Sequence, residues 1–354
     1  MLKQLIAGFA LALAGTGIAA SAAADVVPAK VDTFRDWAVG CDNGLACQAV
    51  ALMPQASPEG SLAMVLSRGA GVNGIFAIEM SGFTSKSDRY RVVIDGKIAD
   101  TGTIPVGSDT IRVTGADAMK LARAMARGRV LRLIDGAGTD LGLASLTGST
   151  AAFRYTDAAQ GRAGSRGAII ATGPKTPGAR KVVLPVITAK KISPSGVLPD
   201  AAALVTLSEN SPCSAQRFGP TQDTAYSLGT GANGPQALVL LNCGSGAYNF
   251  SVGAYVSQQD ANGKWSFALA KFDYPPAGLA ENTGIPLLVN AEWNEAKQRL
   301  GAYSKSRGIG DCGRSEGYVW DGAMFRLTDA AAMEPCRGSL DWIPVWRAEV
   351  KLVD

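Results

Sequence analysis

The six cysteines constrain this chain more than any other feature. They fall into three pairs that are close in sequence: Cys41 and Cys47, Cys213 and Cys243, and Cys312 and Cys336. An even number of cysteines in an exported chain is typical of a disulfide framework. Six cysteines allow many pairings, and we predict that each bonds its nearest neighbour in sequence. The chain has no C-x-x-C motif, which redox chemistry usually uses, so the cysteines are interpreted as structural.

The N-terminus has the order of segments found in secretory signal peptides. Lys3 is followed by an apolar run over 5–14 and by small residues that end at Ala24. A membrane anchor is the alternative, but this run is too short to span ~30 Å of hydrocarbon, which takes roughly 20 apolar residues. We therefore expect residues 1–24 to be removed as a signal peptide. The protein is then periplasmic or secreted, with no transmembrane segment in the remaining chain.

Length and patterning predict two mainly β domains. The chain of 354 residues is long enough for two domains at roughly 150 residues each. Residues 25–160 are expected to form a β-rich domain with two short helices, and residues 200–354 an all-β domain of antiparallel hairpins. Residues 161–199 hold seven basic residues, five prolines and no acidic residue, which is typical of a linker. Within this linker, residues 181–187 can form an edge strand.

Local patterns predict several elements of the first domain. Residues 37–50 read as a short hairpin closed by the first cysteine pair. A strand over 90–94 enters an Asp95-Gly96 hairpin turn. Thr114 and Asp117 form a capping pattern for a helix that ends before residue 128, and a second helix is expected over 150–160.

The second domain shows alternation typical of strands. Residues 248–257 and 265–269 alternate apolar and polar side chains around a turn at 260–263, which predicts a hairpin. Residues 290–303 are ambiguous, because their apolar residues fit both helical and strand spacing.

Most reaction apparatus is absent from the sequence. The chain has no histidine, which excludes Ser-His-Asp and Cys-His catalysis and histidine-ligated metals. Three G-x-G-x-x-G patterns lie in glycine-rich turns rather than before helices, so we expect no cofactor and no metal. Asp311, Glu316 and Asp321 are the remaining candidates for acid–base chemistry, as a carboxylate pair in a glycan hydrolase. Turns are the simpler explanation, since Asp321 precedes Gly322 in a hairpin turn and Asp311 flanks Cys312 in another.

Charge does not indicate a polyanionic partner. The 34 basic and 30 acidic residues give a net charge of +4, which falls to +3 without Lys3. We expect no nucleic-acid binding. The basic segment 161–199 could touch an anionic membrane or polysaccharide, although a solvated connector has the same composition.

Tryptophans and arginines near the last cysteine pair form a candidate binding face. Exposed aromatic and arginine side chains are common anchors in interfaces and on sugar-binding surfaces. The candidate residues are Trp320, Arg326, Arg337, Trp342, Trp346 and Arg347. Tryptophans packed on a disulfide in the core are the alternative.

Five sequence blocks resemble the proteobacterial domain-of-unknown-function family 1176. They lie at 34–43, 145–164, 308–313, 318–322 and 336–338. The Trp37-x-x-x-Cys41 opening is also similar to the invasion-associated locus B family, over the first domain only. The resemblance implies an envelope or secreted protein with no assigned activity and no catalytic residues to carry over. It also implies a strand–turn–strand at residues 290–303.

The sequence therefore favours a non-catalytic binding or interaction protein of the envelope, with an envelope protein or a glycan as partner. A histidine-free glycan hydrolase and a purely structural envelope component are the alternatives.

Overall fold

The computed structural model describes residues 25–54, 61–176, 180, 182–214, 217, 222–279 and 285–354. The expected signal peptide, residues 1–24, lies outside the described residues. Within these ranges the chain forms twenty-three strands and three helices. The mainly β fold is confirmed, and so are the three predicted disulfides. No helix formed in the described ranges is both long and apolar enough to cross a bilayer.

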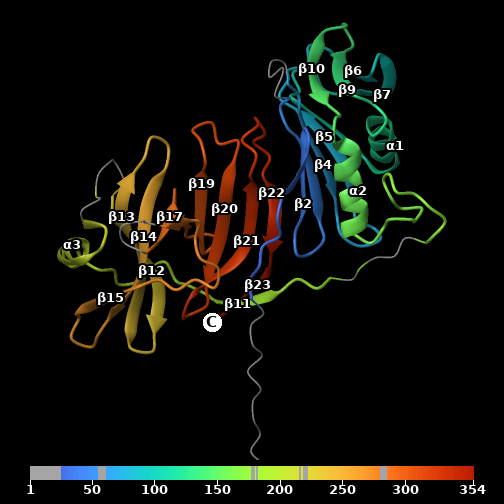
Figure 1. Ribbon diagram of the computed structural model, residues 1–354. Helices are drawn as coiled ribbons and strands as arrows, with labels where there is room; N and C mark the ends of the chain where they lie inside the picture. The colour runs from blue at the N-terminus through green and yellow to red at the C-terminus, as the bar shows by residue number, and fades with distance from the viewer. Residues whose placement is uncertain are drawn as a thin grey trace, which may run out of the picture.

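The N-terminal part is built on a six-stranded antiparallel sheet (Figure 1). Its strands, in sheet order, are β1 (Asp32–Phe34), β2 (Trp37–Cys41), β3 (Cys47–Ala51), β4 (Ala63–Arg68), β5 (Phe76–Ser81) and β8 (Thr110–Thr114). The predicted hairpin is β2 and β3. Cys41 lies opposite Cys47 in its register, with Cα atoms 3.9 Å apart. The disulfide therefore closes this hairpin beside its turn.

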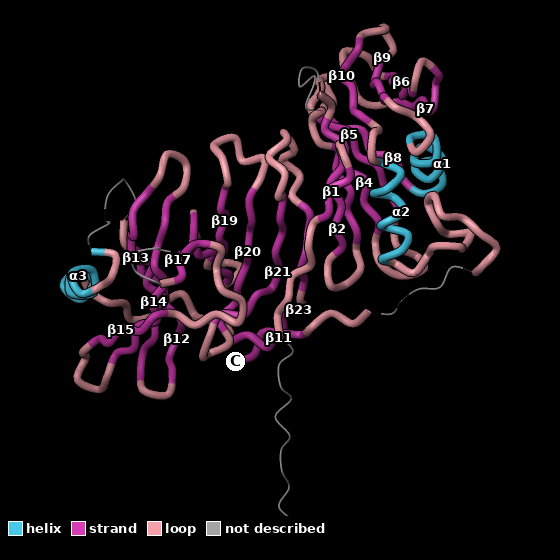
Figure 2. Tube along the Cα trace, viewed as in Figure 1, coloured by secondary structure: helices cyan, strands magenta, loops and turns pink. Residues whose placement is uncertain are grey.

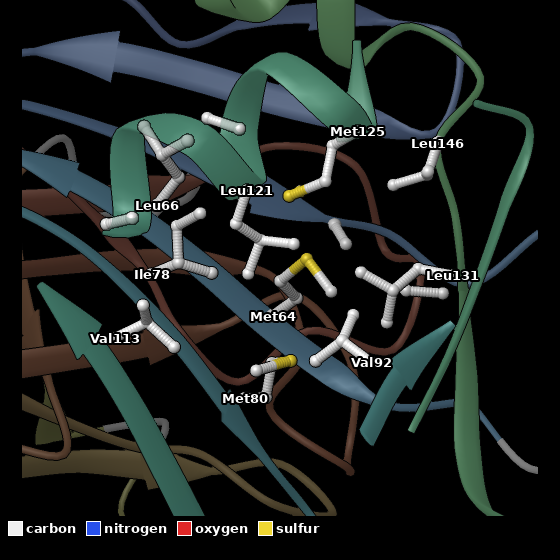
Figure 3. Close-up of a cluster of buried hydrophobic side chains, with 14 of the residues drawn as sticks. Met64, Leu66, Ile78, Met80, Val92, Val113, Leu121, Met125, Leu131 and Leu146 are labelled. Atoms are coloured by element: carbon white, nitrogen blue, oxygen red, sulfur yellow. The ribbon is translucent and has the colours of Figure 1, made fainter. Parts of the chain in front are cut away.

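A four-stranded sheet and two helices cover one face of the six-stranded sheet. The strands are, in order, β10 (Asp140–Ser145), β9 (Val130–Asp135), β6 (Arg89–Ile94) and β7 (Lys97–Thr103). The predicted Asp95-Gly96 turn joins β6 to β7, and both residues have positive φ, 47° and 83°, as a two-residue hairpin turn requires. Figure 3 shows the enclosed core, where Met64, Ile78 and Val92 lie close together.

Both helices predicted for this part are present, as α1 (Gly115–Met125) and α2 (Ser149–Ala159). The predicted capping of α1 was wrong. Thr114 occupies the N-cap position, but its side chain makes no hydrogen bond to the helix. The backbone of Thr114 is extended, as at an N-cap, with φ −132° and ψ 162°, but the next residue, Gly115, is left-handed with a φ of 62°, so the first helical residue lacks the helical backbone that a capping box has at that position.

The first part of the expected linker packs against the first domain. Ala168 and Ile169 are fully buried. The buried carboxylate of Asp157 in α2 accepts hydrogen bonds from the backbone N–H groups of Ile169, Ile170 and Ala171. Residues 161–176 are therefore held by specific contacts with α2.

The linker strand lies further along than expected. β11 (Val186–Lys190) pairs in parallel with β23 (Glu349–Val353), whereas residues 181–187 were predicted. Pro185 has no N–H to donate to a strand ladder, and its oxygen accepts a hydrogen bond from the backbone N–H of Glu349. The strand consequently starts after the proline, and the end of the chain returns to the linker.

The C-terminal part contains two further antiparallel sheets. The strands of the first are, in order, β12 (Thr224–Gly231), β13 (Gly234–Ser245), β14 (Phe250–Gln259), β17 (Pro286–Val289) and β16 (Gly278–Leu279), with β15 (Trp265–Leu269) also paired to β14. Those of the second are β18 (Glu292–Asn294), β19 (Arg299–Lys305), β20 (Gly313–Trp320), β21 (Phe325–Met333) and β22 (Ile343–Arg347). The predicted hairpin around residues 260–263 is β14 and β15. The ambiguous stretch 290–303 is strand, turn and strand, as the family resemblance implied.

Helix α3 (Ala201–Asn210) corrects the expectation of an all-β C-terminal domain. Asp200 is its N-cap, and the side chain accepts a hydrogen bond of 2.8 Å from the backbone N–H of Ala203. Leu207 is the one buried side chain of α3, so the helix lacks the apolar stripe by which amphipathic helices are recognised. Figure 2 shows α3 at the opposite end of the molecule from α1 and α2.

The N-terminal and C-terminal parts share a core. Alternate residues of β2 and β3 point away from α1 and α2. Of these, Ala38 and Val50 are buried in one cluster with Ile343 and Val345 of β22. Figure 1 shows β22 running beside β2. The contact between the two parts is therefore an apolar core and not only a linker.

Candidate binding groove

The tryptophans of the predicted binding face do not form an open surface. Trp320 and Trp346 are 2% and 8% exposed, and the indole N–H of Trp346 donates to the backbone oxygen of Leu327. Trp342 is partly buried and stacks on Tyr303, with ring centroids 4.4 Å apart. All three tryptophans belong to or pack against the C-terminal core, as the alternative interpretation held.

The arginines of that face are held in ion pairs. The pairs are Arg326 with Asp321, Arg337 with Asp36, and Arg347 with Asp42. The last two join the C-terminal part to the β1–β3 region of the N-terminal part. The guanidinium groups of Arg337 and Arg347 therefore fasten the two parts together, and the six predicted residues are not assembled as one surface for a ligand.

Of the three candidate carboxylates, Asp311 precedes β20, Glu316 lies within it and Asp321 follows it. Asp311 is fully buried, and its hydrogen bond from Arg307 lowers its pKa. Glu316 is buried in the core. Asp321 accepts hydrogen bonds from the backbone N–H groups that follow it in its turn. No two of these carboxylates face each other across a cleft. Among the described residues, no cluster of Asp, Glu and Cys could hold a metal ion.

A groove lies between α3 and the β14–β15 hairpin, away from all of these residues. Its volume is about 680 Å³, within the range of roughly 300–1,000 Å³ that is usual for ligand sites. We call it the α3 groove. One wall is α3, and the floor is residue 255 with residues 263–269. A hollow of about 700 Å³ also lies beside the start of α1, but its one aromatic residue, Phe76, is buried.

The wall of the α3 groove is one face of the helix. Ala203, Thr206, Leu207 and Asn210 line it, and their spacing of three and four residues places them in one row. Because α3 rests on the sheet mainly through Leu207, the rest of this face stays open toward the groove.

The floor of the groove is aromatic. Trp265, Phe267 and Leu269 alternate along β15, so their side chains share one face of the sheet, and Leu269 lies opposite Tyr255 of β14. Trp265 and Phe267 are partly exposed. Tyr255 is buried, which raises the pKa of its phenol. Aromatic rings with a polar group at one end suit a ligand that is partly apolar and partly hydrogen-bonding.

Polar side chains also line the groove. Asp200 and Lys264 are the charged residues that line the groove, and they have opposite signs. The side chains of Thr206, Asn210 and Ser211 supply hydroxyl and amide groups along the wall. An apolar floor with a small number of polar groups is the usual composition of a binding site.

A disulfide anchors the wall to the sheet. Cys213 follows α3 closely and bonds Cys243 at the end of β13. Both cysteines are buried in a small core together with Leu207, Val239 and Leu241. The C-terminal end of α3 is therefore fixed on the sheet.

None of the groove residues was among the predicted site residues. Trp265 and Phe267 were predicted only as part of a strand, and α3 was not predicted. Asp200 as an N-cap, followed by Leu204 and Leu207 three residues apart, was the available signal for the helix. No pattern in the sequence indicates where that helix docks.

The chain was compared with known proteins and solved structures. It is 27% identical over 337 residues to an uncharacterized protein of Escherichia coli K12, YpfG, and this similarity covers 88% of this chain and 91% of that protein. The crystal structure of invasion associated protein B from Bartonella henselae matches with a TM-score of 0.29 and 14% identity, over 37% of this chain and 99% of that one.

A family model covers most of the chain. The model described as "Protein of unknown function (DUF1176)" matches residues 31–349, which include both parts of the fold and all six cysteines. This chain therefore belongs to the DUF1176 family.

Proposed function

We propose that this protein is a non-catalytic binding protein of the periplasm or the extracellular space, and that the α3 groove holds its partner. Three disulfides support a location outside the cytosol, since cytosolic thiols are kept reduced. The sequence pattern of residues 1–24 supports export by a signal peptide.

The groove is the observation that carries the binding role. It combines Trp265, Phe267 and Leu269, all at least partly exposed, in a concave site whose wall is fixed by a disulfide. Water in contact with an exposed aromatic side chain is unfavourable in free energy, and a partner that covers the ring relieves this; aromatic residues are also enriched at binding hot spots. A purely structural envelope component would have no need of such a site.

The placement of the acidic residues supports a non-catalytic role. Carboxylate pairs in glycosidases face each other across the bond that they cleave. Here Asp311 and Asp321 serve a buried ion pair and a turn, while Glu316 lies inside the core. A hydrolase would need another pair of carboxylates on an open surface.

Affinity capture from envelope extract tests the proposal. The chain without residues 1–24 and its Trp265→Ala variant would be immobilised side by side, and captured proteins and glycans identified by mass spectrometry. We expect a partner retained by the unaltered chain and lost with Trp265→Ala, but retained by Val72→Ala, which alters an exposed residue outside the groove. Equal capture by all three proteins would contradict the assignment to the groove.

A further inference from the structure

Strand β15 borders the α3 groove, and among the described strands it pairs with β14 alone. The register places Ser257 opposite Phe267 without a bulge. The backbone N–H of Ala270 donates to the oxygen of Ala254 at 2.9 Å, which identifies the hydrogen-bonded pairs of the ladder. In an antiparallel ladder such pairs alternate with pairs that exchange no hydrogen bond.

The alternation determines where the backbone groups of β15 point. Ser266 and Ala268 direct theirs toward β14, and Trp265, Phe267 and Leu269 direct theirs toward the open edge of the sheet. In the part of the chain that the structure describes, no hydrogen bond reaches the backbone N–H or oxygen of these three residues. The open edge therefore presents donors and acceptors at every second residue.

This edge lacks the usual protection against pairing. Proteins shield exposed edge strands with charged residues, prolines or bulges. Residues 265–269 read Trp-Ser-Phe-Ala-Leu, with no charge and no proline. The outward backbone groups belong to the same three residues whose side chains form the floor of the groove. A strand paired to β15 would consequently project every second side chain on the groove side of the sheet.

We propose that the α3 groove binds an extended segment of a partner protein by β-strand addition to β15, with apolar side chains of that segment in the groove. This inference rests on the proposed function of the groove. The charges of Asp200 and Lys264 cancel, so the lining has no net charge that would favour an acidic glycan, and a segment without net charge suits it. The backbone supplies affinity and the aromatic floor selects the side chains, as in other complexes formed by strand addition.

An array of random heptapeptides, probed with the chain lacking residues 1–24, tests the inference. The best binder would be synthesised in two N-methylated forms, one blocking the amides of its odd residues and one those of its even residues. Only one set of amides faces β15, so we expect one form to bind about tenfold more weakly and the other to keep its affinity. This comparison uses the unaltered protein.

A pair of variants tests the protein side of the same contact. Phe267→Pro removes an outward N–H while leaving the β14–β15 ladder intact, and Phe267→Ala keeps that N–H. We expect binding by Phe267→Pro to be roughly three- to tenfold weaker than by Phe267→Ala. Far-ultraviolet circular dichroism would confirm that both variants fold.

Several results would contradict strand addition to β15. Equal weakening by both N-methylated peptides, equal binding by both Phe267 variants, or no selected peptide would each overturn strand addition. If chitohexaose or peptidoglycan fragments bind with loss in Trp265→Ala while no peptide binds, strand addition fails and the binding role of the groove stands. If neither class binds and envelope capture is unaffected by Trp265→Ala, both proposals fail.

Discussion

Glu316 is a buried carboxyl group on β20 of the C-terminal part. It is 3% exposed and lies on β20 between Ala302 and Ala330 of the neighbouring strands. Among the described residues, neither of its oxygens has a hydrogen-bond partner. Burial raises its pKa to about 7, and Arg314 offsets part of that effect. The folded protein therefore binds a proton that the unfolded chain releases at lower pH.

The raised pKa of Glu316 predicts stability that depends on pH. The stability that the folded protein gains by binding this proton is fully present below pH 4.5, the ordinary pKa of a glutamate. It is lost as the pH rises toward about 7, the pKa of Glu316 in the folded protein. We expect the free energy of unfolding to fall by up to about 3 kcal/mol across that window. Glu316→Gln should remove this decrease and be the more stable protein at pH 8, as measured by urea unfolding at several pH values.

The matched control is Glu209→Gln, since Glu209 is exposed on α3. This variant should keep the pH profile of the unaltered chain. If the free energy of unfolding of Glu316→Gln depends on pH as that of the unaltered chain does, then Glu316 titrates normally.

Arg337 joins two segments that are about three hundred residues apart. It donates hydrogen bonds to Asp36 and to the backbone oxygens of Arg35 and Met53. Arg337→Met should lower the free energy of unfolding by roughly 2–3 kcal/mol, because charge-assisted bonds are lost and partly buried acceptors are left unpaired.

Urea unfolding would measure this loss against Arg112→Met. Arg112 forms an ion pair with Glu79 in which the two side chains are 55% and 40% exposed, so its removal should cost less than about 1 kcal/mol. Losses of equal size would contradict a fastening role for Arg337.

We expect the position of helix α3 on the sheet to depend on the Cys213–Cys243 disulfide more than on packing. Replacing both Cys213 and Cys243 by serine should cost about 3.5 kcal/mol in the chain-entropy estimate. Because Leu207 is the only buried side chain of α3, the helix should also lose protection in native-state hydrogen exchange. Probe peptides selected for the groove should bind more weakly.

The control for that experiment replaces both Cys41 and Cys47 by serine. This disulfide lies within the N-terminal part, so its loss should lower global stability without exposing the amides of α3. Unchanged exchange of α3 after removal of the Cys213–Cys243 bond would show that packing alone holds the helix.

The core shared by the N-terminal and C-terminal parts predicts that the two parts unfold together. Ala38 and Val50 of the first sheet and Ile343 of the last are buried together, so neither part can keep its apolar surface covered alone. Calorimetry of the chain lacking residues 1–24 should show one transition. Val50→Asp should shift that transition as a whole, by an amount equivalent to at least about 3 kcal/mol.

Val72→Asp, at an exposed loop position, should leave the transition almost unchanged. Two well-separated transitions in the unaltered chain would mean that the two parts fold independently and that their contact adds little stability. The domain boundaries inferred from the sequence stay a prediction until such a measurement is made.

Local sequence patterns were enough to predict the features that depend on neighbours within about thirty residues. Short spacing along the chain predicted the three disulfides, and turn residues predicted the hairpin at 37–50 and the Asp95-Gly96 turn after the strand at 90–94. These features follow from local geometry, because period-two patterning and positive-φ turns act within a single hairpin.

Which aromatic residues are buried, and where a groove is left open, could not be predicted without the three-dimensional arrangement of the sheets and α3. Trp320 and Trp346 are covered by strands and sheets distant in sequence, whereas Trp265 is left partly exposed beside a helix that rests on the sheet through Leu207. Burial depends on what the rest of the chain places over a side chain. Two tryptophans in equally strand-like segments therefore have the same sequence pattern and opposite surroundings.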